Sequence, residues 1–185
     1  MTHAIYMAPL ASQSRIRRLD AGAIVVVYRL DADYDFPAPD EYPRRPSCMI
    51  SPHFSYHNED PATRPFFRVH KGYEWDGCSF KWRLGPIAIG IYDGEPDPVT
   101  GKPRTWQASL RHDPWYEFIL DLTRHFCGRQ AVTLRECWMV QSIGDRLFFE
   151  TAKADGFADA ETYYRWIRRV GWFLIARRYV GREHP

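Results

Sequence analysis

The stretch Ser109-Leu110-Arg111-His112-Asp113-Pro114-Trp115-Tyr116 places a histidine directly beside an aspartate, inside a region of helical texture that runs over roughly 105–126. A second aspartate, Asp145, lies in a later helical region, and an Asp76-Gly77-Cys78 turn precedes both. A histidine beside one carboxylate and within reach of another is what a metal-assisted hydrolase needs. One acid can hold a cation while the other fixes the imidazole tautomer, so that the imidazole can take a proton from water.

Two more helices are expected after the first. One begins at Thr133, where Thr133-x-x-Glu136 has the form of a capping box, and continues to Gly156. Gly144 interrupts it at a cost of about 1 kcal/mol against alanine, so a packing reason is expected there. The last helix runs from near Asp159 to about Tyr179. Its apolar face is expected to carry Tyr163, Ile167, Val170, Gly171 and Leu174, and its other face Arg165, Arg168 and Arg169.

The first half of the chain favours strands and loops. Residues 1–22 are expected to be an irregular lead-in, and Ala23–Leu30 a strand because of its β-branched residues. Seven prolines between Asp31 and Pro65 indicate a loop-rich segment without helix. Further strands are expected at Phe66–His70 and Pro86–Tyr92.

The fold class predicted from this order is α+β, with a small, mostly antiparallel β part followed by three helices. No flexible linker separates the halves, so a single composite domain is expected, with residues 1–65 as a Pro-rich N-terminal segment holding one strand and 66–185 as the core.

Composition narrows the function classes. The chain has 185 residues, 45% of them hydrophobic, and a net charge of +2, which is too small to argue for nucleic acid. No apolar run approaches the roughly 20 residues of a membrane span, and the N-terminus lacks a signal-peptide pattern. The cysteines show no CxxC spacing, and free thiols are expected; they are Cys48, Cys78, Cys127 and Cys137.

The chemistry-bearing residues predict one site. If the helix of His112 packs antiparallel to the next helix, Asp145 can face the imidazole and leave its other nitrogen free as a base. Tyr116 shares the helix face of His112 and could hydrogen-bond Asp145. Asp113 would point toward the Asp76-Gly77 turn, where carboxylate and carbonyl oxygens suit Ca²⁺, which would polarise an ester carbonyl.

These motifs, in this order, resemble those of a known enzyme family. The Asp76-Gly77-Cys78 turn, the Arg111–Tyr116 helix and Asp145-Arg146-Leu147-Phe148 look like the Asp-x-Cys calcium turn, the Arg-His-Asp-x-x-Tyr helix and the Asp-x-x-Phe helix of secreted phospholipase A2, especially its bacterial and fungal branch. The tail Thr162–Gly171 is similar as well. The resemblance implies a phospholipase A2-like helical core and Ca²⁺-dependent hydrolysis of a phospholipid ester.

By that resemblance, each site residue has an expected role. His112 would activate water, Asp145 would orient the imidazole, and Tyr116 would brace Asp145. The ligands of Ca²⁺ would be Asp76, Asp113 and the Gly77 carbonyl. The expected partner is a phospholipid or a membrane surface.

The chain also resembles a family of uncharacterised tailed-phage proteins with an HDxxY helix, whose strand and turn match Phe67–Ser79. That resemblance implies the alternative of a non-catalytic virion or assembly protein that keeps the fold and contacts other virion proteins. The expected location is accordingly the cytoplasm of the producing cell or the phage particle. Together the two resemblances cover roughly residues 66–172.

Some residues depart from the enzyme pattern or allow another interpretation. Ser109 stands where the bacterial enzymes have a cysteine, which leaves Cys78 without its expected partner. Pro114 would fit the first position of a helix with Asp113 as its N-cap, where Asp113 would be a poorer metal ligand. His112 could then be a surface residue, and Asp145 a buried acid without catalytic work. Several tryptophans could line a lipid-binding rim or the core, namely Trp75, Trp82, Trp106, Trp115 and Trp138.

Overall fold

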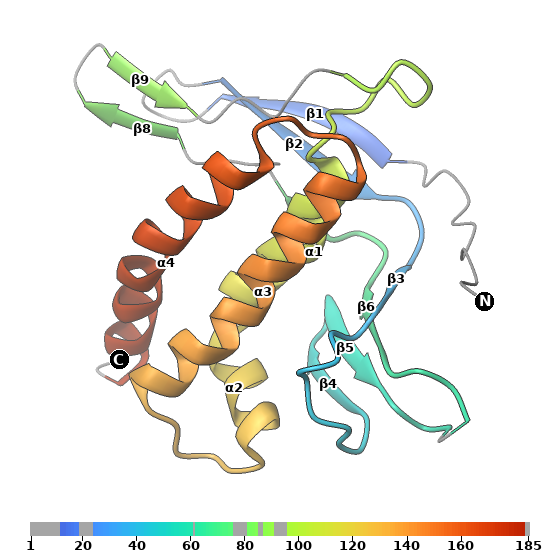
Figure 1. The fold of residues 1–185 in the computed structure, drawn as a ribbon, viewed down its shortest axis with the longest axis vertical. Coiled ribbons are helices and arrows are strands. Elements are labelled where there is room, and N and C mark those ends of the chain that lie inside the picture. Colours follow the sequence, from blue (N-terminus) through green and yellow to red (C-terminus); the bar gives the residue numbers. More distant parts are fainter. Residues whose placement is uncertain are drawn as a thin grey trace.

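The chain folds into an α+β structure in which antiparallel sheets lie against a helical layer (Figure 1). The computed structural model describes residues 12–18, 24–60, 62–75, 81–84, 87–90 and 96–183. The strands are β1 (Ser12–Arg18), β2 (Ile24–Leu30), β3 (Tyr34–Pro37), β4 (Cys48–Ser51), β5 (Phe54–His57), β6 (Phe66–Val69), β7 (Glu74–Trp75), β8 (Lys81–Leu84) and β9 (Ile87–Gly90). The helices are α1 (Trp106–Glu117), α2 (Ile119–Cys127), α3 (Leu134–Ala154) and α4 (Ala160–Glu183).

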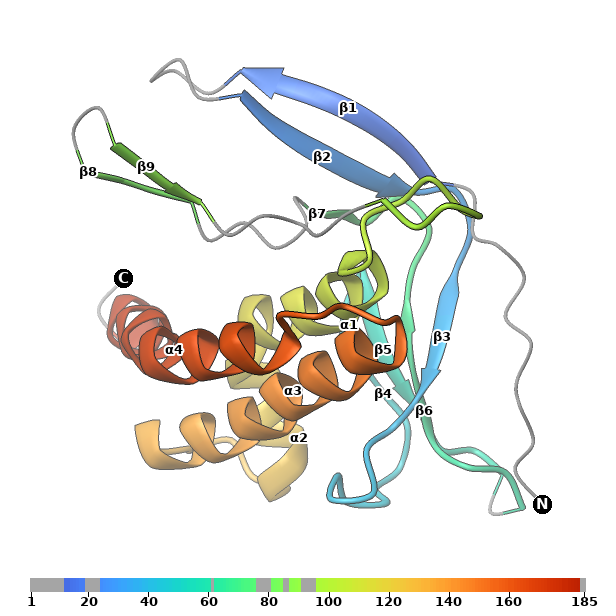
Figure 2. The ribbon, with the colours of Figure 1, turned by 45° about the horizontal axis from the view of Figure 1, so that its top comes forward.

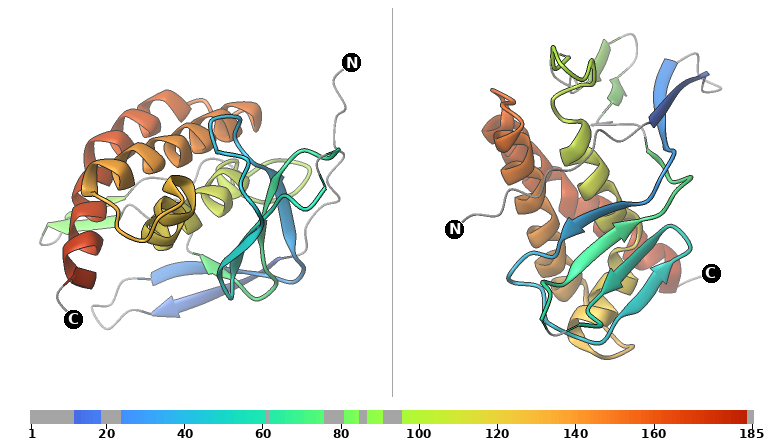
Figure 3. Two further views of the ribbon diagram at one scale, coloured as in Figure 1. Left: turned by 90° about the horizontal axis from the view of Figure 1, so that it is seen from below. Right: turned by 90° about the vertical axis from the view of Figure 1, so that its right-hand side faces the viewer.

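The four-stranded sheet, in the order β3-β6-β5-β4, supports the helix that carries His112. Alternate side chains point to opposite faces of a strand, and here one face is aromatic and buried. That face consists of Tyr34, Phe36, Phe54, Tyr56, Phe67 and Val69. Its central ring, Phe67, lies 5.4 Å from the ring of Trp115 on α1, so the sheet and α1 share one core. Figure 3 shows this sheet beside the helices.

Helix α3 packs against both α1 and α4 (Figure 2). It approaches α1 closely at Gly144, where a Cβ atom would come within 2.8 Å of Cγ of Trp115. The packing reason expected for this glycine is therefore confirmed.

A Gly144→Ala variant is expected to be less stable than the wild type by about 1–3 kcal/mol, because the indole of Trp115 is fully buried and cannot move aside. Thermal or urea unfolding measures the change. Gly181→Ala is the matched control: Gly181 lies in α4, where an added Cβ would have nothing within 4 Å, and should gain up to about 1 kcal/mol in helix propensity. Equal effects of the two substitutions would contradict the close approach.

The α+β class and the antiparallel sheets are as predicted, but the helix count is not. The first predicted helix is divided at Phe118, whose backbone leaves the helical region with φ −111° and ψ 26°. The Phe118 ring stacks on Phe54 at 6.3 Å, and α2 then begins in a new direction with Ile119 and Leu120 buried. Tertiary packing on the sheet therefore ends α1 and gives four helices in place of three.

The prediction of a single strand within residues 1–65 is also wrong, since β1 to β5 all lie there. Prolines do not prevent these strands because they fall at strand ends or in connections, as at Pro37, in the turn at Pro52, and at Pro65 just before β6. Both β3 and β5 pair with β6, so the predicted boundary at residue 65 cuts through one sheet. Residues on both sides of it belong to one hydrophobic core, which favours the single composite domain.

Among the described residues, no helix is both long enough and apolar enough to cross a bilayer.

Candidate active site

His112 and Asp145 face each other across the α1–α3 contact. Nε2 of the imidazole lies 3.0 Å from Oδ1 of Asp145, and the two side chains are 10% and 1% exposed. The predicted contact between these residues is thus confirmed, and His112 is not a surface residue. A buried imidazole with one nitrogen on a carboxylate has its tautomer and its ring orientation fixed by that carboxylate.

Tyr116, one helical turn after His112, completes this side of the site. Its hydroxyl donates to Oδ1 of Asp145 at 3.3 Å, as predicted, and its ring lies 4.7 Å from the imidazole. Phe148 contacts the imidazole edge-on at 5.3 Å. Gly171 on α4 leaves room for the Tyr116 hydroxyl, because a Cβ atom at this position would collide with it.

Two residues that the sequence analysis did not include in the site also bind Asp145. Arg168 of α4 donates to Oδ2 at 3.0 Å, and Gln141 of α3 donates to Oδ1 at 2.8 Å. The prediction that Arg168 lies on the outward face of the last helix is wrong: it borders the buried Ile167, and its long side chain reaches inward. Gln141 stands four residues before Asp145 on one helix, a spacing from which the contact could have been predicted.

The four side chains that bond Asp145 determine its charge and the charges of its neighbours; they are His112, Tyr116, Gln141 and Arg168. Burial raises the pKa of Asp145, but the bonds from His112, Gln141 and Arg168 outweigh burial and hold it below its usual value. Burial, together with the Asp145 charge, raises the pKa of Tyr116, which therefore stays a phenol and a donor. Burial lowers the pKa of His112, but the carboxylates of Asp113 and Asp145 outweigh it and raise that pKa to about 9.

The second imidazole nitrogen lies on the side of Asp113. Nδ1 is 3.8 Å from Oδ1 of Asp113, which is longer than a direct hydrogen bond between these two atoms. Asp113 is not an N-cap, because α1 begins at Trp106 and Pro114 lies in its interior. The competing interpretation of Asp113 as a helix cap, which would have made it a poorer metal ligand, is therefore wrong.

The predicted calcium site is only partly within the described residues. Asp113 is described and its side chain is 28% exposed, whereas Asp76, Gly77 and Cys78 lie outside the described residues. The residues that the structure describes contain no group of three or more histidine, cysteine or acidic side chains suited to a metal ion. Within them, Asp113 thus offers one hard oxygen donor, and a complete site depends on the turn.

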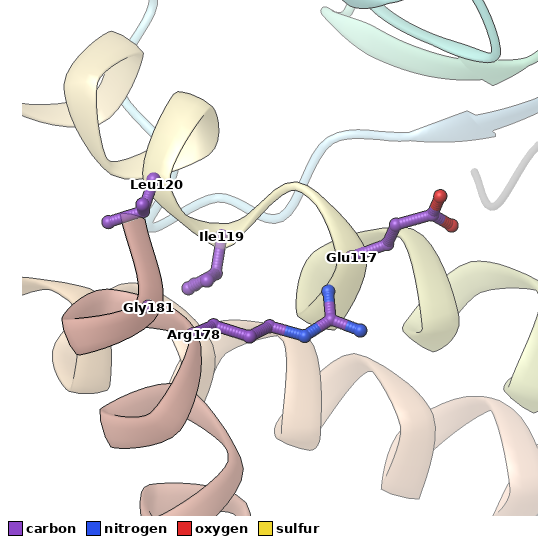
Figure 4. Close-up of a pocket in the computed structure, with 5 residues that line it drawn as sticks. All are labelled: Glu117, Ile119, Leu120, Arg178 and Gly181. Carbon is purple, nitrogen blue, oxygen red and sulfur yellow. The ribbon is translucent and has the colours of Figure 1, made fainter. Parts of the chain in front are cut away.

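A pocket of about 340 Å³ opens just beyond the end of α1 (Figure 4). It is lined by Glu117, Ile119, Leu120, Arg178 and Gly181. The guanidinium of Arg178 donates to the backbone carbonyl of Tyr116, which places the pocket next to the residue that braces Asp145. Its walls combine apolar side chains with one charge of each sign.

Other predicted features fall into the core. Trp75, Trp106 and Trp115 are buried, so they form no lipid-binding rim; Trp138 is 46% exposed, and Trp82 has no described side chain. The free thiols expected at three of the four cysteines are confirmed, at Cys48, Cys127 and Cys137.

A second histidine cluster lies on the outer face of the four-stranded sheet. The hydroxyl of Ser55 lies 2.8 Å from Nε2 of His57 and 2.9 Å from Nε2 of His70, and Nδ1 of His57 lies 3.0 Å from Glu59. Ser55 is only 3% exposed on a central strand, so these bonds satisfy a buried hydroxyl and leave it no approach for a substrate.

Comparisons of the chain with protein-family models, with curated proteins and with solved structures found no match.

Proposed function

We propose that the chain is a Ca²⁺-dependent hydrolase of phospholipid esters that uses the His112–Asp145 pair. One observation carries the proposal: Nε2 of a buried imidazole is fixed by Asp145 at 3.0 Å, and Nδ1 is turned away from that acid. This is the arrangement of a general base with an orienting carboxylate. The ordered motifs of the sequence supply the substrate class.

In the proposed reaction, Nδ1 of His112 in its neutral form, which prevails above the pKa of about 9, takes a proton from a water molecule as the water oxygen attacks the ester carbonyl carbon. Asp145 stabilises the imidazolium that forms and remains ionised itself. The bond from the carbonyl carbon to the alkoxy oxygen then breaks, and the imidazolium returns its proton to that oxygen. The products are a fatty acid and a lysophospholipid, and the base is regenerated.

Arg168, Gln141 and Tyr116 contribute by keeping Asp145 in place. With all three bonded to the carboxylate, rotation of Asp145 away from His112 would break several hydrogen bonds at once. The general base therefore keeps one orientation, which is what proton transfer within a narrow distance range requires.

Asp113 would hold Ca²⁺ together with Asp76 and the Gly77 carbonyl. When bound there, Ca²⁺ supplies positive charge that polarises the ester carbonyl. Carboxylate and carbonyl oxygens are the ligands that this hard cation prefers, and Asp113 is partly exposed and directly follows the base in sequence.

Release of labelled fatty acid from a phospholipid, measured with Ca²⁺ and with EDTA, tests the proposal. His112→Ala is expected to lower the rate by a factor of roughly 10²–10⁴, the usual contribution of a general base. His53→Ala is the matched control, because His53 is an exposed histidine on a turn of the sheet. Turnover of the wild type no higher than that of His112→Ala would overturn the proposal.

The virion role is the second candidate, and it rests on the phage-family resemblance. It predicts that the protein sediments with particles and that His112→Ala still supports assembly of normal virions. A wild-type protein without turnover that behaves in this way would replace the enzyme proposal with the structural one.

A further inference from the structure

Helix α4 has an inner face that contacts the site and an outer face that nothing in the described structure covers. Ile167 and Ile175 are buried on the inner face. On the outer face, apolar side chains recur every seventh residue and are about half exposed: Trp166 at 54%, Phe173 at 48% and Val180 at 55%. Residues seven apart lie on nearly the same line along a helix, so these three form one exposed apolar stripe.

The surroundings of the stripe are aromatic and basic. Trp172 is 55% exposed and meets the Phe173 ring edge-on at 6.1 Å. Three exposed arginines flank the stripe; they are Arg165, Arg169 and Arg177. Glu161 pairs with Arg165 at 3.1 Å. Between residues 161 and 181 the sequence has one acidic residue, which is this Glu161. The outer face therefore combines large apolar side chains with a net positive charge.

We propose that the outer face of α4 docks onto an anionic phospholipid bilayer, with the stripe inserted at the headgroup boundary and the arginines on lipid phosphates. The proposal rests on the proposed function for its relevance, since a bilayer is the form in which phospholipid would be presented to the site. Helices of this kind lie in the plane of the interface, with aromatic residues inserted and arginine side chains extended to the headgroups.

The arrangement fits a lipid surface better than a partner helix. A partner helix would contact α4 along one narrow seam that follows the stripe. Arg177 lies four residues after Phe173 and three before Val180, so its charged guanidinium would be enclosed in that seam. At a bilayer the same side chain reaches the phosphates. At 100° per residue, Trp172 and Trp166 lie roughly 120° apart around the axis, so the exposed aromatic face is as broad as a flat surface requires.

A second copy of the chain is also disfavoured as the occupant. Two outer faces packed in antiparallel fashion about Phe173 would bring Arg177 of one copy to Arg169 of the other. The single acid, Glu161, is already paired with Arg165 and lies at the far end of the helix. Like charges opposed in this way destabilise an interface, whereas anionic headgroups neutralise them.

The inner face of the same helix connects the docked surface to the site. Arg168 bonds Asp145, Gly171 contacts Tyr116, and Arg178 bonds the Tyr116 carbonyl beside the 340 Å³ pocket. A helix is about 10 Å thick with its side chains, so a bilayer under α4 would lie about one helix diameter from the His112–Asp145 pair. Docking would thus hold the site close to the lipid.

Sedimentation with vesicles tests the docking surface directly. The full-length protein is mixed, in EDTA, with vesicles of phosphatidylcholine alone or of phosphatidylcholine with phosphatidylglycerol. Binding is expected to the second kind and to weaken as salt is raised. Trp166→Ser combined with Phe173→Ser should reduce the partition coefficient roughly 30-fold or more, from the apolar area no longer inserted.

Two further variants sharpen the test. Met49→Ser combined with Val99→Ser removes apolar side chains that are more exposed, at 71% and 90%, and that lie on β4 and in the turn before α1, so this variant should bind as the wild type does. Arg165→Gln combined with Arg169→Gln should reduce binding roughly 10-fold on the anionic vesicles and leave binding to phosphatidylcholine unchanged. All of these side chains are exposed, so the variants should unfold at the wild-type temperature.

The outcomes separate this inference from the proposed function. Vesicle binding that depends on Trp166 and Phe173, without any ester hydrolysis, supports the docking surface and refutes the hydrolase. If the protein hydrolyses the ester but the α4 variants bind vesicles as the wild type does, the docking surface is overturned and the hydrolase stands. Wild-type protein that stays in the supernatant, or that associates with itself through α4 in place of vesicles, overturns it as well.

Discussion

Asp145→Ala is expected to lower the free energy of unfolding by about 3–5 kcal/mol. Asp145 is 1% exposed and is the counter-charge for the buried imidazole of His112 and for Arg168. Without it, the buried imidazole and the partly buried guanidinium both lose the carboxylate that they contact at 3.0 Å, which is among the most destabilising changes that a single substitution produces. Urea unfolding of the two proteins at neutral pH measures the loss.

Two comparisons identify the cause of that loss. Asp121→Ala removes a carboxylate from a surface pair with Arg124 at 3.0 Å, and should cost no more than about 1 kcal/mol. Adding Arg168→Met to Asp145→Ala should recover part of the loss, because one of the two uncompensated charges is then gone. A single Asp145→Ala variant as stable as Asp121→Ala would mean that the carboxylate does not stabilise the fold.

The pairing of His112 with Asp145 could be predicted because it follows from local sequence features of the two helices that carry these residues. The capping box at Thr133 fixes where α3 begins, and it is observed: the Glu136 N–H donates to the Thr133 hydroxyl, and the Thr133 N–H donates to the Glu136 carboxylate. From that start, helical periodicity determines which face Asp145 occupies. A short connection between the first predicted helical stretch, over roughly 105–126, and Thr133 then makes an antiparallel neighbour the simplest arrangement.

The role of Arg168 could not be predicted in the same way. Periodicity places it at the edge of the apolar face of α4, where a long side chain can turn either inward or outward. The direction that the Arg168 side chain takes depends on how α4 crosses α3, because its partner is the buried carboxylate of Asp145 on α3. The charge of the partner was in the sequence, but its position relative to α4 was not.

The strands of the first 65 residues were missed for a different reason. β3, β4 and β5 have four residues each, too few to show a clear alternation, and prolines surround them. They become strands because they pair with β6 and with one another, and these contacts lie far apart along the chain. Their aromatic residues, such as Phe54 and Tyr56, gain stability from cross-strand rings that a local pattern does not reveal.

The stability of the fold is expected to fall between pH 6.5 and 9 through the titration of His112. Its pKa is about 9 in the folded protein, where Asp113 and Asp145 outweigh the effect of burial, and about 6.5 in an unfolded chain. A group whose pKa is raised by folding contributes its full stabilisation below the unfolded value and loses it as the pH passes the folded value. The contribution at stake is about 3 kcal/mol.

The difference in unfolding free energy between the wild type and His112→Gln, followed by urea titration from pH 6 to 10, isolates this contribution. Other titrating groups cancel in the difference. Asp145 does not interfere, because its pKa is lowered and its own contribution is lost only as the pH falls into the acidic range. The difference should shrink steadily as the pH rises above 6.5 and level off above 9. A difference that stays constant over this window would show that folding leaves the pKa of His112 at its ordinary value, so that Asp145 would hold Arg168 as its cationic partner above pH 6.5.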